Sequence, residues 1–246
     1  MKKIVYILSF FSIFLYSNEL QDAIDNAPSG SKITLAEGVY KGNIVINKPL
    51  IIDGVNKKAR VVGDGDSSVI TIKSSNVVIK NLTIENSGFS VEKVDSAIHA
   101  KEVNSITIEN NHIEDTLFGI NLEQVNRSKV IDNFITSKDL ELGVRGDAIR
   151  LWSSHDNQLL SNKIYKSRDF VLWYSSGNNI ENNYGSYNRY SLHFMHAGRN
   201  MVRNNFFEYN SVGIFFMYSS GTIAIGNTVK NSLGAFGVGI GMKDSS

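Results

Sequence analysis

The sequence predicts an all-β protein, a right-handed parallel β-helix with coils of about 22 residues. Asparagines recur along the chain, and the last three intervals between them are 21, 22 and 22 residues. Around each asparagine, Ile or Val alternates with polar residues, the period of two that is typical of a strand. Pro28 and Pro49, the two prolines, both precede most of these segments, so no proline interrupts pairing between the later coils. The recurring asparagines are Asn81, Asn111, Asn133, Asn162, Asn183, Asn205 and Asn227.

The residue types favour a β-helix over other solenoids of similar period. A leucine-rich repeat needs a Leu consensus, whereas these repeats use Ile, Val and Asn. Asparagine suits the corners of a β-helix because it tolerates left-handed backbone conformations. Its side-chain amides can also form hydrogen-bonded ladders between coils.

The first 17 residues are typical of a secretory signal peptide. Positive charge at Met1–Lys3 precedes an apolar run from Ile4 to Tyr16, and the small Ser17 follows. This run is shorter than the roughly 20 residues that span a bilayer. We therefore expect an exported protein that reaches the periplasm. An uncleaved anchor is the alternative, because Leu15 is a poor residue at the third position before the cut.

Residues 18–73 are expected to form an N-terminal cap with the first coils, and residues 74–246 the repeats. Leu20, Ala23, Ile24 and Ala27 share one helical face, which predicts a helix that covers the open end of the solenoid. Longer asparagine intervals predict loops near residues 87–95 and 137–147. At the other end residues 237–246 begin a further coil, so we expect a truncated chain that lacks its C-terminal coils.

Composition limits the chemistry available to this chain. It has 246 residues with 25 basic and 24 acidic side chains, a net charge of +1 that offers no overall field to attract nucleic acid. It has no cysteine, which excludes disulfides, zinc–thiolate sites and iron–sulfur clusters. Any metal site must use His, Met, Asp or Glu.

Stacking the second strand of each coil assigns side chains to two faces. The first inward ladder is Ile98, Ile120, Ile149, Val171, Leu192 and Ile214, and the second is Leu122, Leu151, Trp173, Phe194 and Phe216. The outward positions are polar in early coils and large in later ones, where they are Arg150, Leu172, His193, Phe215, Trp152, Tyr174, Met195 and Met217. A contiguous wall of large apolar side chains on a solvated face indicates an interaction surface.

Part of this wall suggests a copper site. Met195 and Met217 are expected one coil apart, about 5 Å, with His193 on the same face and His196 just after the strand. Thioether and imidazole hold cuprous copper where thiolate is absent, so these four residues are the candidate metal ligands. We interpret a second set as partner-binding: Arg150, Trp152, Leu172, Tyr174 and Phe215. The alternative is that these side chains pack under a loop.

Two other functions are alternatives to copper handling. Extracellular β-helices often cut polysaccharides, and hydrolysis requires carboxylates that converge on one face. The outward columns of the later coils hold none, since Asp147 and Asp169 lie at strand entrances one coil apart. We therefore expect a protein that is not an enzyme. A polysaccharide lyase or hydrolase and a passive protein-binding scaffold remain the alternatives.

Several segments closely resemble the NosD family. They are residues 145–153, 168–175, 189–195 and 212–219, together with 20–54, which looks like the N-terminal cap of that family. The resemblance implies a non-catalytic periplasmic β-helix protein that is needed to mature nitrous oxide reductase. It also implies that the protein sits on an ABC transporter permease with its ATPase. There it would work with a lipoprotein copper chaperone to supply copper, as transient Cu⁺, for the enzyme's copper–sulfur centre. The resemblance does not identify the metal ligands.

Overall fold

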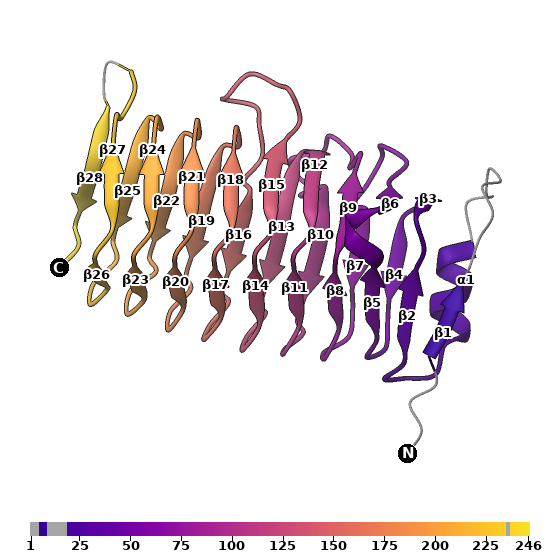
Figure 1. The fold of residues 1–246 in the computed structure, drawn as a ribbon. Coiled ribbons are helices and arrows are strands. Elements are labelled where there is room, and N and C mark those ends of the chain that lie inside the picture. Colours follow the sequence, from indigo (N-terminus) through magenta and orange to yellow (C-terminus); the bar gives the residue numbers. More distant parts are fainter. Residues whose placement is uncertain (1–4, 9–18, 235–236) are drawn as a thin grey trace.

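The computed structural model describes residues 5–8, 19–234 and 237–246, which form a parallel β-helix with three parallel sheets (Figure 1). Each complete coil contributes one strand to each sheet, so the predicted fold class is confirmed. Sheet A contains β1 (Val5–Leu8), β2 (Lys32–Leu35), β5 (Ile51–Gly54), β8 (Val78–Lys80), β11 (Thr107–Glu109), β14 (Lys129–Ile131), β17 (Gln158–Leu160), β20 (Asn179–Glu181), β23 (Met201–Arg203) and β26 (Ile223–Ile225).

Sheets B and C form the other two sides of the coil. Sheet B contains β3 (Gly38–Lys41), β6 (Ala59–Val62), β9 (Leu82–Glu85), β12 (His112–Thr116), β15 (Phe134–Ser137), β18 (Lys163–Tyr165), β21 (Tyr184–Ser186), β24 (Phe206–Glu208) and β27 (Thr228–Lys230). Sheet C contains β4 (Ile44–Ile46), β7 (Ile70–Ile72), β10 (Ser96–Lys101), β13 (Phe118–Glu123), β16 (Ile149–Trp152), β19 (Asp169–Trp173), β22 (Tyr190–Met195), β25 (Val212–Met217) and β28 (Val238–Lys243). A short 3-10 turn, η1 (Val55–Lys57), precedes β6.

The N-terminal capping helix is confirmed as α1 (Glu19–Asn26). It buries Leu20 and Ile24 against the first coil. Gln21 also bonds the backbone of Val45 in the edge strand β4, accepting from its N–H at 2.7 Å and donating to its carbonyl at 3.1 Å. The helix thus covers both the apolar core and backbone groups at an open sheet edge.

The signal-peptide prediction falls almost entirely outside the described residues. Of residues 1–17 only β1 is described, and it pairs in parallel with β2. Export therefore stays a prediction. Within the described part of the chain, no helix is both long and apolar enough to cross a membrane.

A buried asparagine ladder connects successive coils at the corner between sheets A and B. Asn162, for example, donates to Asn183 Oδ1 at 3.1 Å and to the Val130 carbonyl at 2.8 Å, and its own Oδ1 accepts from the backbone and side chain of Asn133. These bonds satisfy polar groups where the backbone turns inside the core. The ladder consists of Asn111, Asn133, Asn162, Asn183, Asn205 and Asn227.

One ladder member was assigned wrongly from the sequence. Leu82, not Asn81, stands in line with Asn111, because the Leu82 N–H donates to Asn111 Oδ1 at 3.1 Å. Asn81 occupies the preceding position, where the backbone is left-handed with φ +57°. Left-handed backbone thus falls one position before the buried ladder, and that position carries an amide bond of its own, because Asn110 donates to Asn81 Oδ1 at 2.7 Å.

The two predicted insertions are loops that leave the solenoid. One connects β9 to β10, and the other connects β15 to β16 and projects beyond the coils (Figure 1). Both enter strands of sheet C, whose later members carry the candidate site.

Candidate functional site

The outer column is the central feature of sheet C, and we define it as Trp152, Trp173, Met195 and Met217. Each member lies opposite the next on neighbouring parallel strands β16, β19, β22 and β25. All four side chains are half-buried. The predicted adjacency of Met195 and Met217 is confirmed, and adjacent parallel strands lie about 4.8 Å apart.

The register within β19 corrects the facing assignment of this strand. Leu172 has 0% of its surface exposed and lies opposite Leu151 and Phe194 inside the core, so its placement on the outer wall was wrong. Trp173, expected inside, is in the outer column, and Val171 takes the outward position opposite Arg150 and His193. Leu172 therefore cannot contact a partner in this conformation.

A register shift explains the error. Asp169 lies opposite Tyr190 and Val171 opposite His193, so Phe170 alone faces two residues of β22. A one-residue slip moves every following side chain to the other face of a strand. Either register places apolar residues of the segment Phe170–Trp173 in the core, so alternation alone could not locate the slip.

Beside the outer column stands the corner stack, defined as Tyr174, His196 and Tyr218. Their rings are nearly parallel, with centroid distances of 5.2 Å from Tyr174 to His196 and 4.8 Å from His196 to Tyr218. All three residues are exposed and have left-handed backbone, with φ of +50°. The Trp152 ring packs edge-to-face against Tyr174, with the ring centroids 5.4 Å apart. It also packs at a tilt against Trp173, with the centroids 5.0 Å apart, so aromatic contacts join the corner stack to the outer column.

The two candidate histidines differ in access. His193 is only 8% exposed, because its ring stacks on Tyr190 at 4.5 Å and meets Phe215 at 6.0 Å. Its Nδ1 lies 3.6 Å from the Asp169 carboxylate, and its Nε2 has no hydrogen-bond partner among the described residues. His196 follows Met195 directly and is exposed. Of the two histidines, His196 is therefore the accessible one, with its ring held in the corner stack between Tyr174 and Tyr218.

Asp147 and Asp169 lie at the strand entrances where the sequence placed them, but their burial was not predicted. Arg168 Nε donates to Asp147 Oδ1 at 2.9 Å, and Arg189 bonds both oxygens of Asp169 one coil further. Burial and the neighbouring Asp169 charge raise the pKa of Asp147 to about 6. The pKa of Asp169 is lowered: burial opposes this, but bonding to His193 and Arg189 outweighs it. The repeated Arg-Asp spacing was the available signal.

Arg150 ends a polar row on the same outer face. Its guanidinium donates to Asn121 Oδ1 at 2.8 Å and lies 5.2 Å from the Trp152 ring. The Asn121 amide in turn lies 2.9 Å from His99 Nδ1. Arg150 is therefore fixed by two contacts, and Phe215 remains half-buried at its own outward position.

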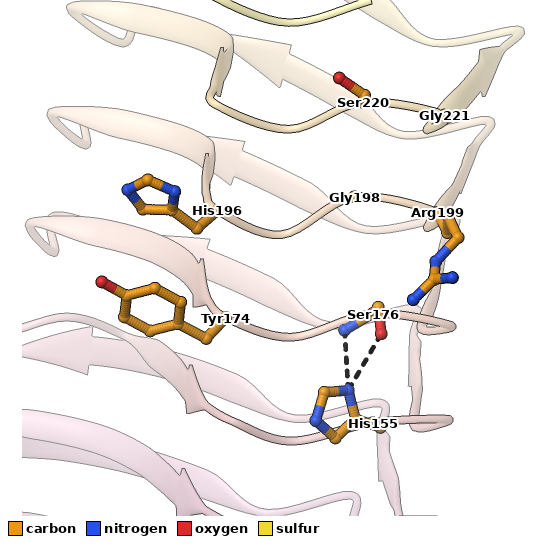
Figure 2. A pocket seen from close by; sticks show the side chains of 8 residues that line it. All are labelled: His155, Tyr174, Ser176, His196, Gly198, Arg199, Ser220 and Gly221. Carbon is orange, nitrogen blue, oxygen red and sulfur yellow. Dashed lines mark hydrogen bonds between the residues drawn. The ribbon is translucent and has the colours of Figure 1, made fainter.

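The corner groove is a hollow of about 620 Å³ at the turn from sheet C to sheet A (Figure 2). Tyr174 and His196 lie on one side, Ser176 and Gly198 belong to the turn between, and Arg199 lies on the other side, with His155 one coil below Ser176. None of the described residues that line it is acidic. The groove is open to solvent and runs along the stacked coils.

Acidic and imidazole groups do not form a conventional metal centre here. Among the described residues, no group of three or more His, Cys, Asp or Glu side chains could hold a metal ion. A soft site must therefore depend on thioether sulfur, which only the methionines of this cysteine-free chain supply.

Comparison with solved structures places the fold among known β-helices. An alginate lyase from Paenibacillus sp. str. FPU-7 has a TM-score of 0.67 at 14% identity over 92% of this chain and 95% of that one. The Dettilon tailspike protein has a TM-score of 0.69 at 14% identity, over 90% of this chain and 54% of that one. The Family 28 exopolygalacturonase of Yersinia enterocolitica has a TM-score of 0.64 at 12% identity, over 86% of this chain and 54% of that one. At these identities the similarity shows the fold alone.

Sequence comparison is more specific than the shared fold. No curated protein matched the chain. Residues 132–246 match the family model described as "Periplasmic copper-binding protein (NosD)", and this stretch contains the whole outer column, the corner stack and the corner groove. By this match the later coils of the chain, residues 132–246, are similar to the NosD family.

Proposed function

We propose that this protein is a periplasmic accessory protein that handles copper during assembly of the copper–sulfur centre of nitrous oxide reductase. The family match supports a periplasmic, copper-related role. The further steps rest on the resemblance of its later coils to NosD. In this proposal the protein acts with an ABC transporter permease and its ATPase, and receives copper from a lipoprotein chaperone.

The observation that carries the proposal is the register of Met195 and Met217. Two thioethers on adjacent parallel strands face the same side, and the exposed imidazole of His196 follows Met195 directly. Sulfur and imidazole are soft ligands that suit Cu⁺. Few ligands and an open position are appropriate for a metal that must be passed on, so we propose transient binding by these three residues, with copper as cargo.

His193 is not needed in this first coordination set. Its ring would have to leave the stack on Tyr190 before Nε2 could reach a metal. We propose that Trp152, Trp173, Tyr174, Phe215 and Arg150 form the surface that a partner protein contacts. Aromatic residues and arginine are the types enriched where protein partners bind.

A competition titration with cuprous ion tests the copper site. The purified protein should withdraw Cu⁺ from a chromophoric chelator, and Met195→Leu with Met217→Leu should weaken binding at least about tenfold. Leucine preserves volume and apolarity, so the fold should persist. Met201→Leu is the matched control, because Met201 is also a half-buried strand residue but lies in sheet A. Equal affinity in the double variant and the wild type would remove the copper site.

The same variants distinguish the scaffold alternative. If copper affinity is unchanged but association with the chaperone is lost, the outer column serves as a protein interface. A role in polysaccharide cleavage is disfavoured because Asp147 and Asp169 are buried and held by arginines. Robust turnover of a uronate polymer by the purified protein would contradict the non-enzymatic proposal.

A further inference from the structure

We propose that the corner groove binds a sugar chain that carries carboxylates, such as an oligouronate. This inference does not depend on copper handling, because the groups that carry it, Arg199 and His155, are outside the methionine pair. The groove offers one cationic side chain and several hydrogen-bonding groups, its described lining residues include no acidic one, and it extends along the solenoid over several coils (Figure 2).

Arg199 supplies the charge. It stands at an exposed left-handed corner position with φ +56°, and its guanidinium makes no salt bridge or side-chain hydrogen bond within the described part of the chain. In Figure 2 it turns toward the coil of Ser176. The flanking corner positions are Gly177 and Gly221, which carry no side chains of their own, and the Asp156 carboxylate from the coil below Gly177 lies against that glycine. A free guanidinium in such a setting is suited to bidentate binding of a carboxylate.

His155 supplies an oriented donor. Its Nδ1 accepts a hydrogen bond from the Ser176 backbone N–H at 3.1 Å and lies 3.0 Å from the Ser176 hydroxyl. Because Nδ1 is an acceptor, the neutral ring carries its proton on Nε2. That N–H has no partner within the described residues, and it remains available to a carboxylate or hydroxyl oxygen.

The floor of the groove is shaped to admit a chain. A Cβ added at Gly198 would lie 2.2 Å from the Ser220 carbonyl oxygen, so only glycine permits this close approach of neighbouring coils. Coils repeat every 4.8 Å or so, close to the length of one 1,4-linked pyranose unit. A linear sugar chain lying along the axis could therefore present one unit to each coil.

The surface favours a sugar over an acidic peptide. The corner stack turns ring edges outward, because each face of His196 is covered by a tyrosine. The outward ring edges of the corner stack, with the tyrosine hydroxyls and an imidazole N–H, are suited to hydrogen bonding with sugar hydroxyls. A peptide, by contrast, generally needs an apolar pocket for an anchoring side chain. The acidic side chain nearest in the corner column, Asp156, lies against Gly177, outside the lining.

Calorimetric titration with tetragalacturonate tests the proposal, and the methyl-esterified tetramer is the uncharged control ligand. We expect saturable binding with a dissociation constant below about 1 mM, and at least about tenfold weaker binding of the ester. Arg199→Gln should weaken binding of the acid by a similar factor. Arg127→Gln is the matched control, since Arg127 has the same left-handed corner conformation but lies outside the groove.

His155→Asn tests the second donor with little risk to the fold. Asn126 occupies the equivalent position one coil earlier and accepts the His155 backbone N–H at 2.7 Å, so asparagine can maintain this ladder. The variant should bind the acid about threefold to tenfold more weakly, with an unfolding midpoint close to that of the wild type.

Four results would overturn the proposal: no saturable binding, equal affinity for acid and ester, no loss in Arg199→Gln, or tighter binding of tetraglutamate that depends on Arg199. The last would make the groove a peptide site. The Met195 and Met217 double variant should bind the uronate normally, and Arg199→Gln should bind Cu⁺ normally. Failure of one proposal is thus separable from failure of the other.

Discussion

Arg189 grips the buried carboxylate of Asp169 with two hydrogen bonds, from Nε to Oδ1 at 2.9 Å and from the terminal nitrogen to Oδ2 at 2.5 Å. The same carboxylate approaches His193 Nδ1 at 3.6 Å. The Arg189–Asp169 ion pair holds the start of β19 against the start of β22, where the register shifts by one residue. The position of the outer column therefore depends on an ion pair whose members lie upstream of it, Asp169 four residues before Trp173 and Arg189 six residues before Met195.

Arg189→Met should destabilise the protein by about 3 kcal/mol, since removing one partner leaves a charge that is buried and uncompensated. We place the loss at the low end for buried pairs because the Arg189 side chain is 41% exposed. Urea unfolding followed by circular dichroism measures it. The control is Lys58→Met, which removes an exposed pair with Glu37 and should cost less than about 1 kcal/mol. Equal losses in the two variants would contradict the importance of burial.

Asp147 should make stability depend on pH in an unusual direction. Its pKa in the folded protein is about 6, above the ordinary 3.8, so between these values the folded state binds more protons than the unfolded state. The contribution of Asp147 to the free energy of unfolding therefore falls as pH rises through this window. Asp169 acts in the opposite sense, and its contribution is lost at more acidic pH, as its lowered pKa requires.

Asp147→Asn isolates this effect. Asparagine still offers Oδ1 to Arg168 Nε but does not titrate. The stability of the variant relative to the wild type should increase as pH rises from about 4 to 6. Unfolding midpoints measured at several pH values give the comparison. Parallel pH profiles for the two proteins would show that Asp147 titrates normally.

The asparagine ladder should tolerate loss at its end better than in its middle. Asn162→Ala leaves the Asn133 backbone N–H and the Val130 carbonyl without their partners inside the core, at a cost of about 3 kcal/mol. Asn227 is only half-buried, so Asn227→Ala should cost about 1 kcal/mol. Chemical denaturation of both variants decides the order, and a larger loss for Asn227→Ala would refute the burial argument.

Tryptophan fluorescence should report copper at the methionine pair. Trp173 lies opposite Met195 on the neighbouring strand, and Trp152 is one coil further away. Titration with Cu⁺ should therefore change the emission of Trp152→Phe more than that of Trp173→Phe. These two residues are the only tryptophans of the chain, so each variant retains a single reporter. An equal response from both would place the metal elsewhere.

The sequence by itself determined the solenoid, its capping helix, its two loops and the pairing of Met195 with Met217. These features follow from periodicity, because a residue that recurs once per coil must stack on its counterpart. Met195 and Met217 stand in segments of equal length, so counting residues was enough to pair them.

Only the tertiary structure decided which way Leu172 and Trp173 point, and how far His193 is buried. The slip opposite Phe170 leaves no mark in the alternation of apolar residues, and strand parity amplifies one residue of slip into an exchange of faces. The burial of Asp147 and the shape of the corner groove likewise depend on side chains from neighbouring coils. A local pattern cannot encode such contacts, because they exist only once the coils have stacked.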